Sequence, residues 1–255
     1  MNFCKYCVLI IICIFYTQFT NAQIVNIEDK KTHLDSNKIQ GQVNISSKYT
    51  QNTRAVFALY SSIRLDKQAP LSHWMLLGNY NFVRAGQESF IDNGFIHLRF
   101  SKKVKNKLEW EAFGQIQYNE KLRINFRGLL GTGPRFQLLE KEKIKLAVGL
   151  LYMYEYNELD TEFGIRRNHR MSSYFTFRFK PRGNIAFSST SYYQPILSDI
   201  KESRLSTINT LSLKFNEFFS FTSSFSLTYD AQLAKDAPDV PSTTFVWKNG
   251  LRFSF

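Results

Sequence analysis

Charged side chains recur at alternating positions in the middle of the chain, where any chemistry would have to be placed. Glu109 and Glu111 are two residues apart, so on a β-strand they would share a face with their carboxylates about 7 Å apart. Such a pair could supply an acid and a base, but with arginines on neighbouring strands we favour ion pairing. The whole candidate cluster consists of His97, Arg99, Glu109, Glu111, Arg127, Arg135 and Glu155.

Two interpretations of this cluster stay open. If the strands enclose a narrow interior, rows of opposite charge can fill and stiffen it, as in a structural protein of the cell envelope. The same rows can line a narrow channel that selects small polar or anionic solutes. We favour a largely filled interior, because Arg, Gln and Tyr side chains occupy much of the width of a small barrel.

A lipid-modifying hydrolase of the membrane is a further alternative. His169 lies near Ser172 and Ser173, which is the pairing closest to a catalytic base and nucleophile. No third group that would orient the histidine is recognisable, so we expect no enzyme, no cofactor and no metal. One stretch is rich in glycine and contains Gly128, Gly131 and Gly133. Their spacing matches neither the P-loop nor the dinucleotide-binding fingerprint, so we do not expect a phosphate site. We interpret them as bends or as positions that leave room for large side chains.

The elements that must position these residues are strands, because apolar and polar residues alternate over segments of about ten residues. The apolar face is nearly continuous and carries Tyr and Trp, whereas the other face holds Glu, Arg, Gln, Asn and Ser. A small soluble barrel has the opposite arrangement. We therefore predict an all-β fold, an antiparallel transmembrane up-and-down β-barrel. Its roughly twelve strands would span 38–50, 54–65, 73–84, 93–103, 108–119, 124–139, 144–157, 170–180, 185–195, 204–215, 220–233 and 243–255.

The links between these strands predict an orientation. An even number of strands would leave both termini in the periplasm, with longer links outside the cell and shorter turns inside. We expect external links at 158–169, 199–203 and 234–242, and periplasmic turns at 104–107, 181–184 and 216–218. A polar lead-in at 23–37 would precede the barrel of 38–255.

Residues 1–22 have the pattern of a secretory signal peptide, with Lys5 before a short apolar core and cleavage between Ala22 and Gln23. The core is too short for a spanning helix, which is the alternative. All three cysteines lie in this segment, so the mature chain would hold no disulfide. The formal net charge is +12, and +11 without residues 1–22. Solvated turns and a wet barrel wall account for it better than attraction to anionic lipopolysaccharide does.

Apolar and polar residues also alternate in the last stretch, 245–255, which ends on an aromatic residue. Such an end is common for a strand of a membrane barrel and rare for an edge strand of a soluble protein. By likeness to outer-membrane proteins in general, we interpret Leu251, Phe253 and Phe255 as the signal for the barrel-assembly machinery. We expect deletion of Phe255 to lower the yield in the outer membrane far more than it changes any activity.

Several stretches between residues 75 and 157 resemble a known family. They are LLGNYNF at 76–82, NGFIHLRF at 93–100, WEAFGQIQYN at 110–119, RGLLGTGPRF at 127–136 and YMYEY at 152–156. This pattern resembles the DUF481 family, related to salt-induced outer-membrane proteins, in the form found in Bacteroidetes. The resemblance implies a barrel in the outer membrane of a Gram-negative bacterium and carries no catalytic motif. The expected partners are outer-membrane lipid, lipopolysaccharide and the barrel-assembly machinery, with no nucleic acid and a monomeric state.

Overall fold

The computed structural model describes residues 39–51, 55–86 and 88–253. The expected signal peptide with Ala22 and Gln23, the lead-in at 23–37, and Phe255 lie outside these residues. Within them, no helix is long and apolar enough to cross a membrane.

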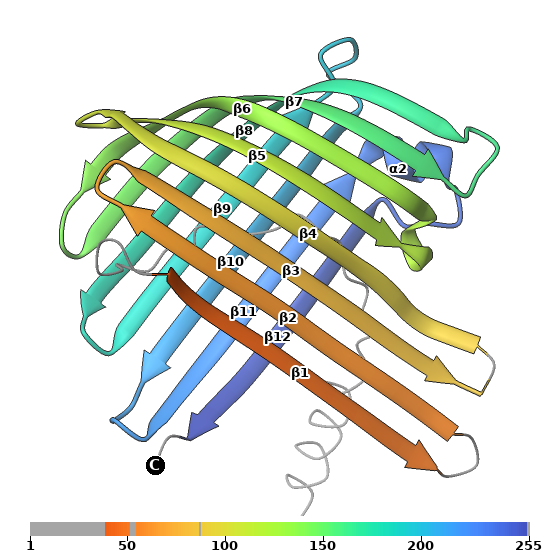
Figure 1. Ribbon diagram of the computed structural model, residues 1–255, viewed down its shortest axis with the longest axis horizontal. Coiled ribbons are helices and arrows are strands. Elements are labelled where there is room, and N and C mark those ends of the chain that lie inside the picture. The colour runs from red at the N-terminus through yellow and green to blue at the C-terminus, as the bar shows by residue number, and fades with distance from the viewer. Residues whose placement is uncertain (1–38, 52–54, 87, 254–255) are drawn as a thin grey trace, which may run out of the picture.

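Twelve antiparallel strands form one sheet in which each strand pairs with the next along the chain (Figure 1). This is the up-and-down order that the alternating pattern predicted. The strands are β1 (Ile39–Gln51), β2 (Ala55–Ala69), β3 (Ser72–Ala85), β4 (Glu88–Lys105), β5 (Leu108–Asn119), β6 (Ile124–Glu140), β7 (Ile144–Leu159), β8 (Ile165–Arg182), β9 (Ile185–Pro195), β10 (Ser203–Lys214), β11 (Phe219–Asp230) and β12 (Thr243–Phe253). A 3-10 turn, η2 (Glu120–Leu122), and a short helix, α2 (Ala231–Asp236), complete the described elements.

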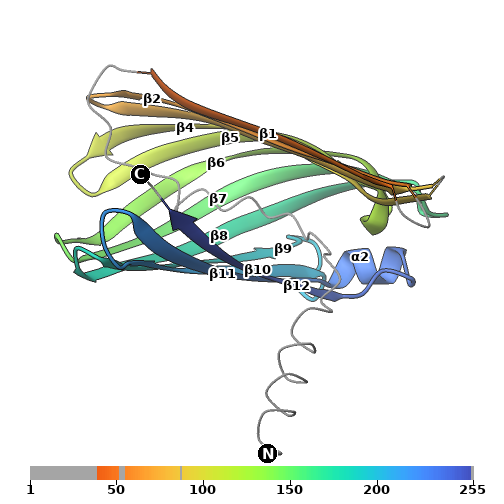
Figure 2. The same ribbon diagram turned by 90° about the horizontal axis from the view of Figure 1, so that it is seen from below.

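The sheet is strongly curved, and alternate residues of each strand lie on its concave and convex faces. In β5 the buried residues fall on every second position from Glu111 to Asn119. Tyr174 on β8 donates a hydrogen bond to Glu111, three strands away, so the buried parity faces the concave side. We call this concave side the interior. Figure 2 shows β1 and β12 as the two edges of the curved sheet.

The convex face carries an exposed apolar band. Leu98, Ile116, Leu130 and Phe175 lie on it, each with more than a third of its surface accessible. Aromatic side chains flank the band near both strand ends, for example Trp74 packed on Phe100 at a centroid distance of 4.5 Å. The strands are 11 to 18 residues long, and about 9–11 residues suffice for a tilted strand to cross a bilayer.

The two ends of the sheet differ. At one end, which we call the turn end, short links join β2 to β3, β4 to β5, β6 to β7, β8 to β9 and β10 to β11. The other end, which we call the cap end, carries the links from β5 to β6, β7 to β8, β9 to β10 and β11 to β12, the last of which contains α2. The turns expected at 104–107 and 181–184 are shorter, at 106–107 and 183–184, and both lie at the turn end. Their periplasmic position stays a prediction.

Several predicted boundaries were wrong, and two of them have a clear structural reason. The strand expected at 220–233 ends at Asp230, because the Asp230 side chain accepts a hydrogen bond from the backbone N–H of Leu233 and starts α2. The long link expected at 158–169 is reduced to 160–164, because β7 and β8 continue pairing as far as Glu158 and Ile165. Polar side chains had suggested a loop there, but they belong to paired strands, with Arg166 and Asn168 on the interior face and Arg167 and His169 on the convex face.

Within the described residues, β1 and β12 are not paired with each other. Both edges nevertheless continue the same alternation. In β12 the residues Phe245, Trp247 and Leu251 are exposed on one parity, and Val246 is buried on the other. Closure of the sheet by these two strands stays a prediction.

Candidate functional site: the charged interior

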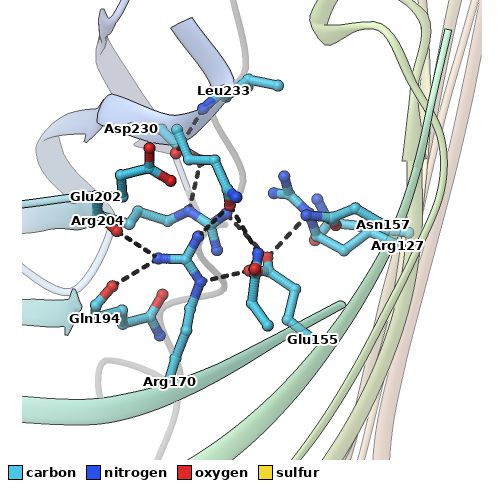
Figure 3. Close-up of polar contacts among 12 residues, drawn as sticks. Arg127, Glu155, Asn157, Arg170, Gln194, Glu202, Arg204, Asp230 and Leu233 are labelled. Atoms are coloured by element: carbon cyan, nitrogen blue, oxygen red, sulfur yellow. Dashed lines mark hydrogen bonds and ion pairs between the residues drawn. The ribbon is translucent and has the colours of Figure 1, made fainter. Parts of the chain in front are cut away.

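The most deeply buried charges of the interior surround Glu155 on β7. We call Glu155, Arg127, Arg170, Arg204 and Asp230 the Glu155 cluster. Figure 3 shows the side chains of Arg170 and Arg204 converging on the Glu155 carboxylate. The N–O distance from Arg204 to Glu155 is 2.9 Å, and the distance from Arg127 is 3.3 Å. Three guanidinium groups therefore share one carboxylate that has no accessible surface.

A second carboxylate and two backbone carbonyls complete this cluster. Asp230 accepts a hydrogen bond of 2.7 Å from Arg204. Arg170 donates to the carbonyl oxygen of Gln194 at 2.8 Å and to that of Glu202 at 3.2 Å. Because buried charge is costly unless it is paired and hydrogen-bonded, this full set of partners is what makes the arrangement possible.

The segment 231–242 lies over this cluster at the cap end, and we call it the cap. The Gln232 side chain accepts hydrogen bonds from Arg170 at 2.8 Å and from Asn168 at 2.7 Å. Asp236 accepts two hydrogen bonds from Arg166 on β8. The apolar side of the cap packs in one buried cluster with residues of η2, β6 and β7; its members are Leu122, Ile124, Leu159, Leu233, Ala237 and Val240.

Arg123 ties the cap to two other links. Its guanidinium pairs with Asp239 of the cap at 2.7 Å and with Asp160 of the β7–β8 link at 3.2 Å. The hydrogen bonds from Arg123 lower the pKa of Asp239 below its ordinary value. On the other side of the cap, Lys235 donates to Glu202 at 2.6 Å, and this bond raises the pKa of Lys235. The cap is therefore held by η2, β6, β7 and β8 and by the links that precede β6 and β10.

From the Glu155 cluster towards the turn end, the interior face carries a packed group of apolar and aromatic side chains. Phe113, Leu151, Met153, Tyr174 and Tyr192 form one buried group contributed by four strands. Glycines on the interior face make this packing possible. A Cβ atom on Gly149 would lie 2.1 Å from the Tyr174 ring, and one on Gly131 would lie 2.4 Å from the Phe113 ring. The expectation that glycines leave room for large side chains is thus confirmed for Gly131, and Gly149 does the same although the expectation did not include it.

A second charged group follows, centred on Glu111 of β5. Arg99 donates to Glu111 at 3.0 Å, and Tyr174 donates to the same carboxylate at 2.6 Å. Arg99 also lies over the rings of Phe113 and Tyr174, at 5.5 and 5.7 Å from their centroids. Arg135 approaches Glu111 at 3.9 Å. This group of paired charges lies next to the aromatic residues, on the side towards the turn end.

The predicted site residues all lie on the interior face, although they do not form one cluster. Arg127 and Glu155 belong to the Glu155 cluster, whereas Arg99 and Arg135 belong to the charged group centred on Glu111. The Nδ1 atom of His97 is 2.9 Å from the Gln115 side chain, and its ring stacks on Phe113. Glu109 pairs with Arg135 at 3.0 Å and keeps about a third of its side chain exposed.

Sequence reasoning missed Arg170, Arg204, Asp230 and Tyr174. Arg170 and Tyr174 share the parity of Ser172, which the alternation placed on the polar face, so parity alone could have assigned them to the interior. The same argument applies to Arg204 at the start of β10. The depth at which each side chain lies had no signal in the sequence.

The histidine considered for hydrolysis lies on the convex face among aromatic rings. The Nδ1 atom of His169 is 2.5 Å from the Tyr152 hydroxyl, and its ring packs against Tyr154. Ser172 lies on the opposite face, where it accepts a hydrogen bond from Gln194, and Ser173 donates to the carbonyl of Tyr193. The structure therefore does not assemble His169 with either serine. Among the described residues, no group of three or more His, Cys, Asp or Glu could hold a metal ion.

Comparison with family profiles matches residues 36–247 to "Protein of unknown function, DUF481". The chain belongs to the DUF481 family. Comparison with curated proteins finds no match. Among solved structures, the NanC porin matches with 8% identity and a TM-score of 0.47, over 85% of this chain and 98% of that one. The KdgM porin, solved with disordered oligogalacturonate, matches with 10% identity and a TM-score of 0.42, over 86% and 99% of the two chains. Identities of 8% and 10% with TM-scores below 0.5 carry no functional argument for this DUF481 protein.

Proposed function

We propose that this DUF481 protein is a barrel of the outer membrane of a Gram-negative bacterium, with a structural role in the envelope and an interior largely filled by its own side chains. The observation that carries this proposal is the cap, packed over the fully buried Glu155 cluster. Charges that line a conducting path stay hydrated, whereas Arg170 and Glu155 have no accessible side-chain surface.

The membrane location rests on the convex face. Its exposed apolar residues run around most of the sheet, which would be an aggregation hazard in water and is what a lipid environment requires. With both termini in the periplasm, the cap end would face outside and meet lipopolysaccharide. The C-terminal residues would be recognised by the barrel-assembly machinery, and the assembled protein would be monomeric. Heat-modifiable mobility in outer-membrane fractions would support this location, and recovery as a soluble periplasmic protein would refute it.

A narrow channel is the second candidate, and the edges of the sheet favour it. The interior face of β1 and β2 is polar and uncharged in its middle, where Asn44 donates to Ser62 at 3.1 Å. Thr210 and Ser224 make a similar wall on β10 and β11, with their hydroxyls 3.2 Å apart. If β1 and β12 close the barrel, any water-filled path would run along these walls.

Conductance in planar lipid bilayers separates the two candidates. A filled interior predicts a silent wild-type protein, and replacement of 231–242 by a short turn is expected to raise conductance by uncovering the Glu155 cluster. A channel predicts wild-type current that changes when Arg99→Gln removes an interior charge. Lys121→Gln, an exposed change of equal charge at the cap end, serves as the control. Steady wild-type current that is sensitive to Arg99 and unaffected by cap removal would refute the filled interior.

A further inference from the structure

The convex face has two adjoining apolar hollows in its exposed band. The larger, of about 550 Å³, lies over β1 to β6, and the smaller, of about 420 Å³, lies over β4 to β7. Ile96 and Ile116 line both hollows and keep 52% and 51% of their surface exposed. We call the two hollows together the wall groove. Neither the Glu155 cluster nor the cap contributes to it.

Strand register sets the course of the wall groove. Directly paired residues form one row across the convex face from the middle of β3 to the cap end of β8. This row consists of Gly78, Ile96, Ile116, Gly128, Tyr156 and Arg167. The wall groove follows it, so one end of the groove lies in the middle of the apolar band and the other approaches the cap end.

The depth of the wall groove comes from positions without a side chain. Gly114 lies on the floor of the smaller hollow, between Ile116 and Leu130 of its lining. A Cβ atom on Gly114 would have the Leu130 side chain as its nearest neighbour, at 4.0 Å, so the space above the floor is open. Leu130 itself stands 67% exposed at the side of the hollow.

In a membrane such a hollow is filled by hydrocarbon. Lipid tails are as apolar as the wall, so the gain on filling the groove is van der Waals contact. An acyl chain in the groove touches a floor and two sides, whereas a chain against the rest of the wall touches one surface. This step rests on the membrane location proposed above.

The cap end of the wall groove offers groups that bind phosphate. Tyr154 and Tyr156 line the smaller hollow, and their hydroxyl groups are hydrogen-bond donors. The Arg167 guanidinium lies over the Tyr156 ring, 5.8 Å from its centroid, and Arg167 is exposed. Glu158 on β7 lies one pair nearer the cap end, opposite Ile165, so the residue paired with the groove's own Tyr156 is the cation. A guanidinium group at this level suits a lipid phosphate.

We propose that the wall groove binds lipopolysaccharide through its lipid A anchor, with acyl chains in the two hollows and a phosphate at Arg167. A lipid whose headgroup lies at the cap end belongs to the outer leaflet when both termini are periplasmic, and lipopolysaccharide is the lipid of that leaflet. Several chains joined to one phosphorylated headgroup match two hollows that meet at Ile96 and Ile116.

The test is native mass spectrometry of the full-length protein in zwitterionic detergent, titrated with diphosphoryl lipid A, phosphatidylglycerol or phosphatidylethanolamine. We expect one lipid A per protein, bound at least tenfold tighter than either phospholipid. Lipid A without its phosphates is expected to bind at least fivefold more weakly. Equal retention of the three lipids, or preference for phosphatidylglycerol, would overturn the proposal.

Two pairs of variants test the hollow and the cation separately. Gly114→Leu fills the smaller hollow and is expected to weaken lipid A binding at least tenfold. Ala112→Leu, on the same strand and face but outside both hollows, is expected to leave binding unchanged. Arg167→Gln is expected to remove the advantage of phosphorylated lipid A. Arg182→Gln, an exposed change at the turn end of the same strand, is expected to keep it.

Heat-modifiable mobility checks that each variant folds, and Gly114→Val, with at least a threefold loss, replaces Gly114→Leu if that variant does not. Equal losses in Gly114→Leu and Ala112→Leu, or a protein dimer that forms in place of the lipid complex, would overturn the proposal. A wild-type protein found in outer-membrane fractions that retains no lipid A would refute this inference and leave the proposed function standing. A soluble periplasmic protein would refute both.

Discussion

Replacement of Glu155 by glutamine tests whether the buried charges of the interior act as one unit. The change keeps the shape of the side chain and removes its charge. Arg127, Arg170 and Arg204 would then share a single nearby carboxylate, that of Asp230. With one carboxylate fewer, buried positive charge is left without compensation. This uncompensated charge is what lowers the free energy of unfolding.

The expected loss of stability is about 3 kcal/mol. Removing one partner of a buried ion pair costs about 3–5 kcal/mol. We take the lower end, because Asp230 still pairs with Arg204 at 2.7 Å and Arg170 still donates to two carbonyl groups. The three pairs of Glu155 cannot be counted separately, since groups in one network are not additive.

The measurement is a urea titration of the protein refolded into phospholipid vesicles, followed by tryptophan fluorescence. With a slope of about 1–3 kcal/mol per molar urea, the loss corresponds to a shift of about 1–3 M in the midpoint. Glu140→Gln is the control, because its ion pair with Lys145 is largely exposed, with 60% of the Glu140 side chain accessible. Such pairs contribute less than about 1 kcal/mol.

A second substitution separates buried charge from other effects. Adding Arg170→Gln to Glu155→Gln removes the excess positive charge, so the double variant is expected to lose less than the sum of the two single losses. Additive losses, or a Glu155→Gln midpoint within about 0.3 M of the wild type, would show that these charges are hydrated and would refute the account of a sealed interior.

Two further predictions concern packing and the cap. Gly149→Ala is expected to destabilise the protein by about 1–3 kcal/mol in the same titration, because the new methyl group would overlap the buried ring of Tyr174, which Glu111 holds in place; Gly250→Ala, with no atom within 4 Å of its new Cβ, should change it little. The tie between Arg123 and Asp239 is expected to be present above about pH 4 and lost as the pH falls through the lowered pKa of Asp239. Limited proteolysis of the cap at pH 7 and pH 3 would show this as faster cleavage at low pH, and Asp239→Asn should cleave fast at both.

The strands could be predicted from the sequence because a sheet between lipid and a polar interior repeats one rule at every second residue. β5 and β9 begin and end where the alternation indicated. For interior residues, the sequence predicts which face of the sheet a side chain lies on, but not which other side chains it contacts. Parity assigns Arg99 and Arg170 equally to the inside, but only the curvature of the sheet brings Arg170 to a carboxylate that Arg127 and Arg204 also reach.

The cap could not be predicted, for a different reason. Its helix AQLAKD is one short element of ordinary composition, and an isolated helix of this length is not stable. It forms because Asp230 caps its first turn and because Leu233 belongs to a buried apolar cluster with residues of η2, β6 and β7. The residues of η2, β6 and β7 are far from the helix in the sequence, so the residue pattern indicated a strand as far as 233 and a link at 234–242.

The two ends of the interior use the same residue types, but desolvation gives their charges different weight in stability. At the cap end, the buried guanidinium groups of Arg170 and Arg204 have carboxylate and carbonyl partners, so the loss of one partner is costly. At the turn end, the ion pair of Lys145 with Glu140 is largely exposed, and water hydrates its charges when the pair is broken. The stability of the sheet therefore depends more on the charges at the cap end than on those at the turn end.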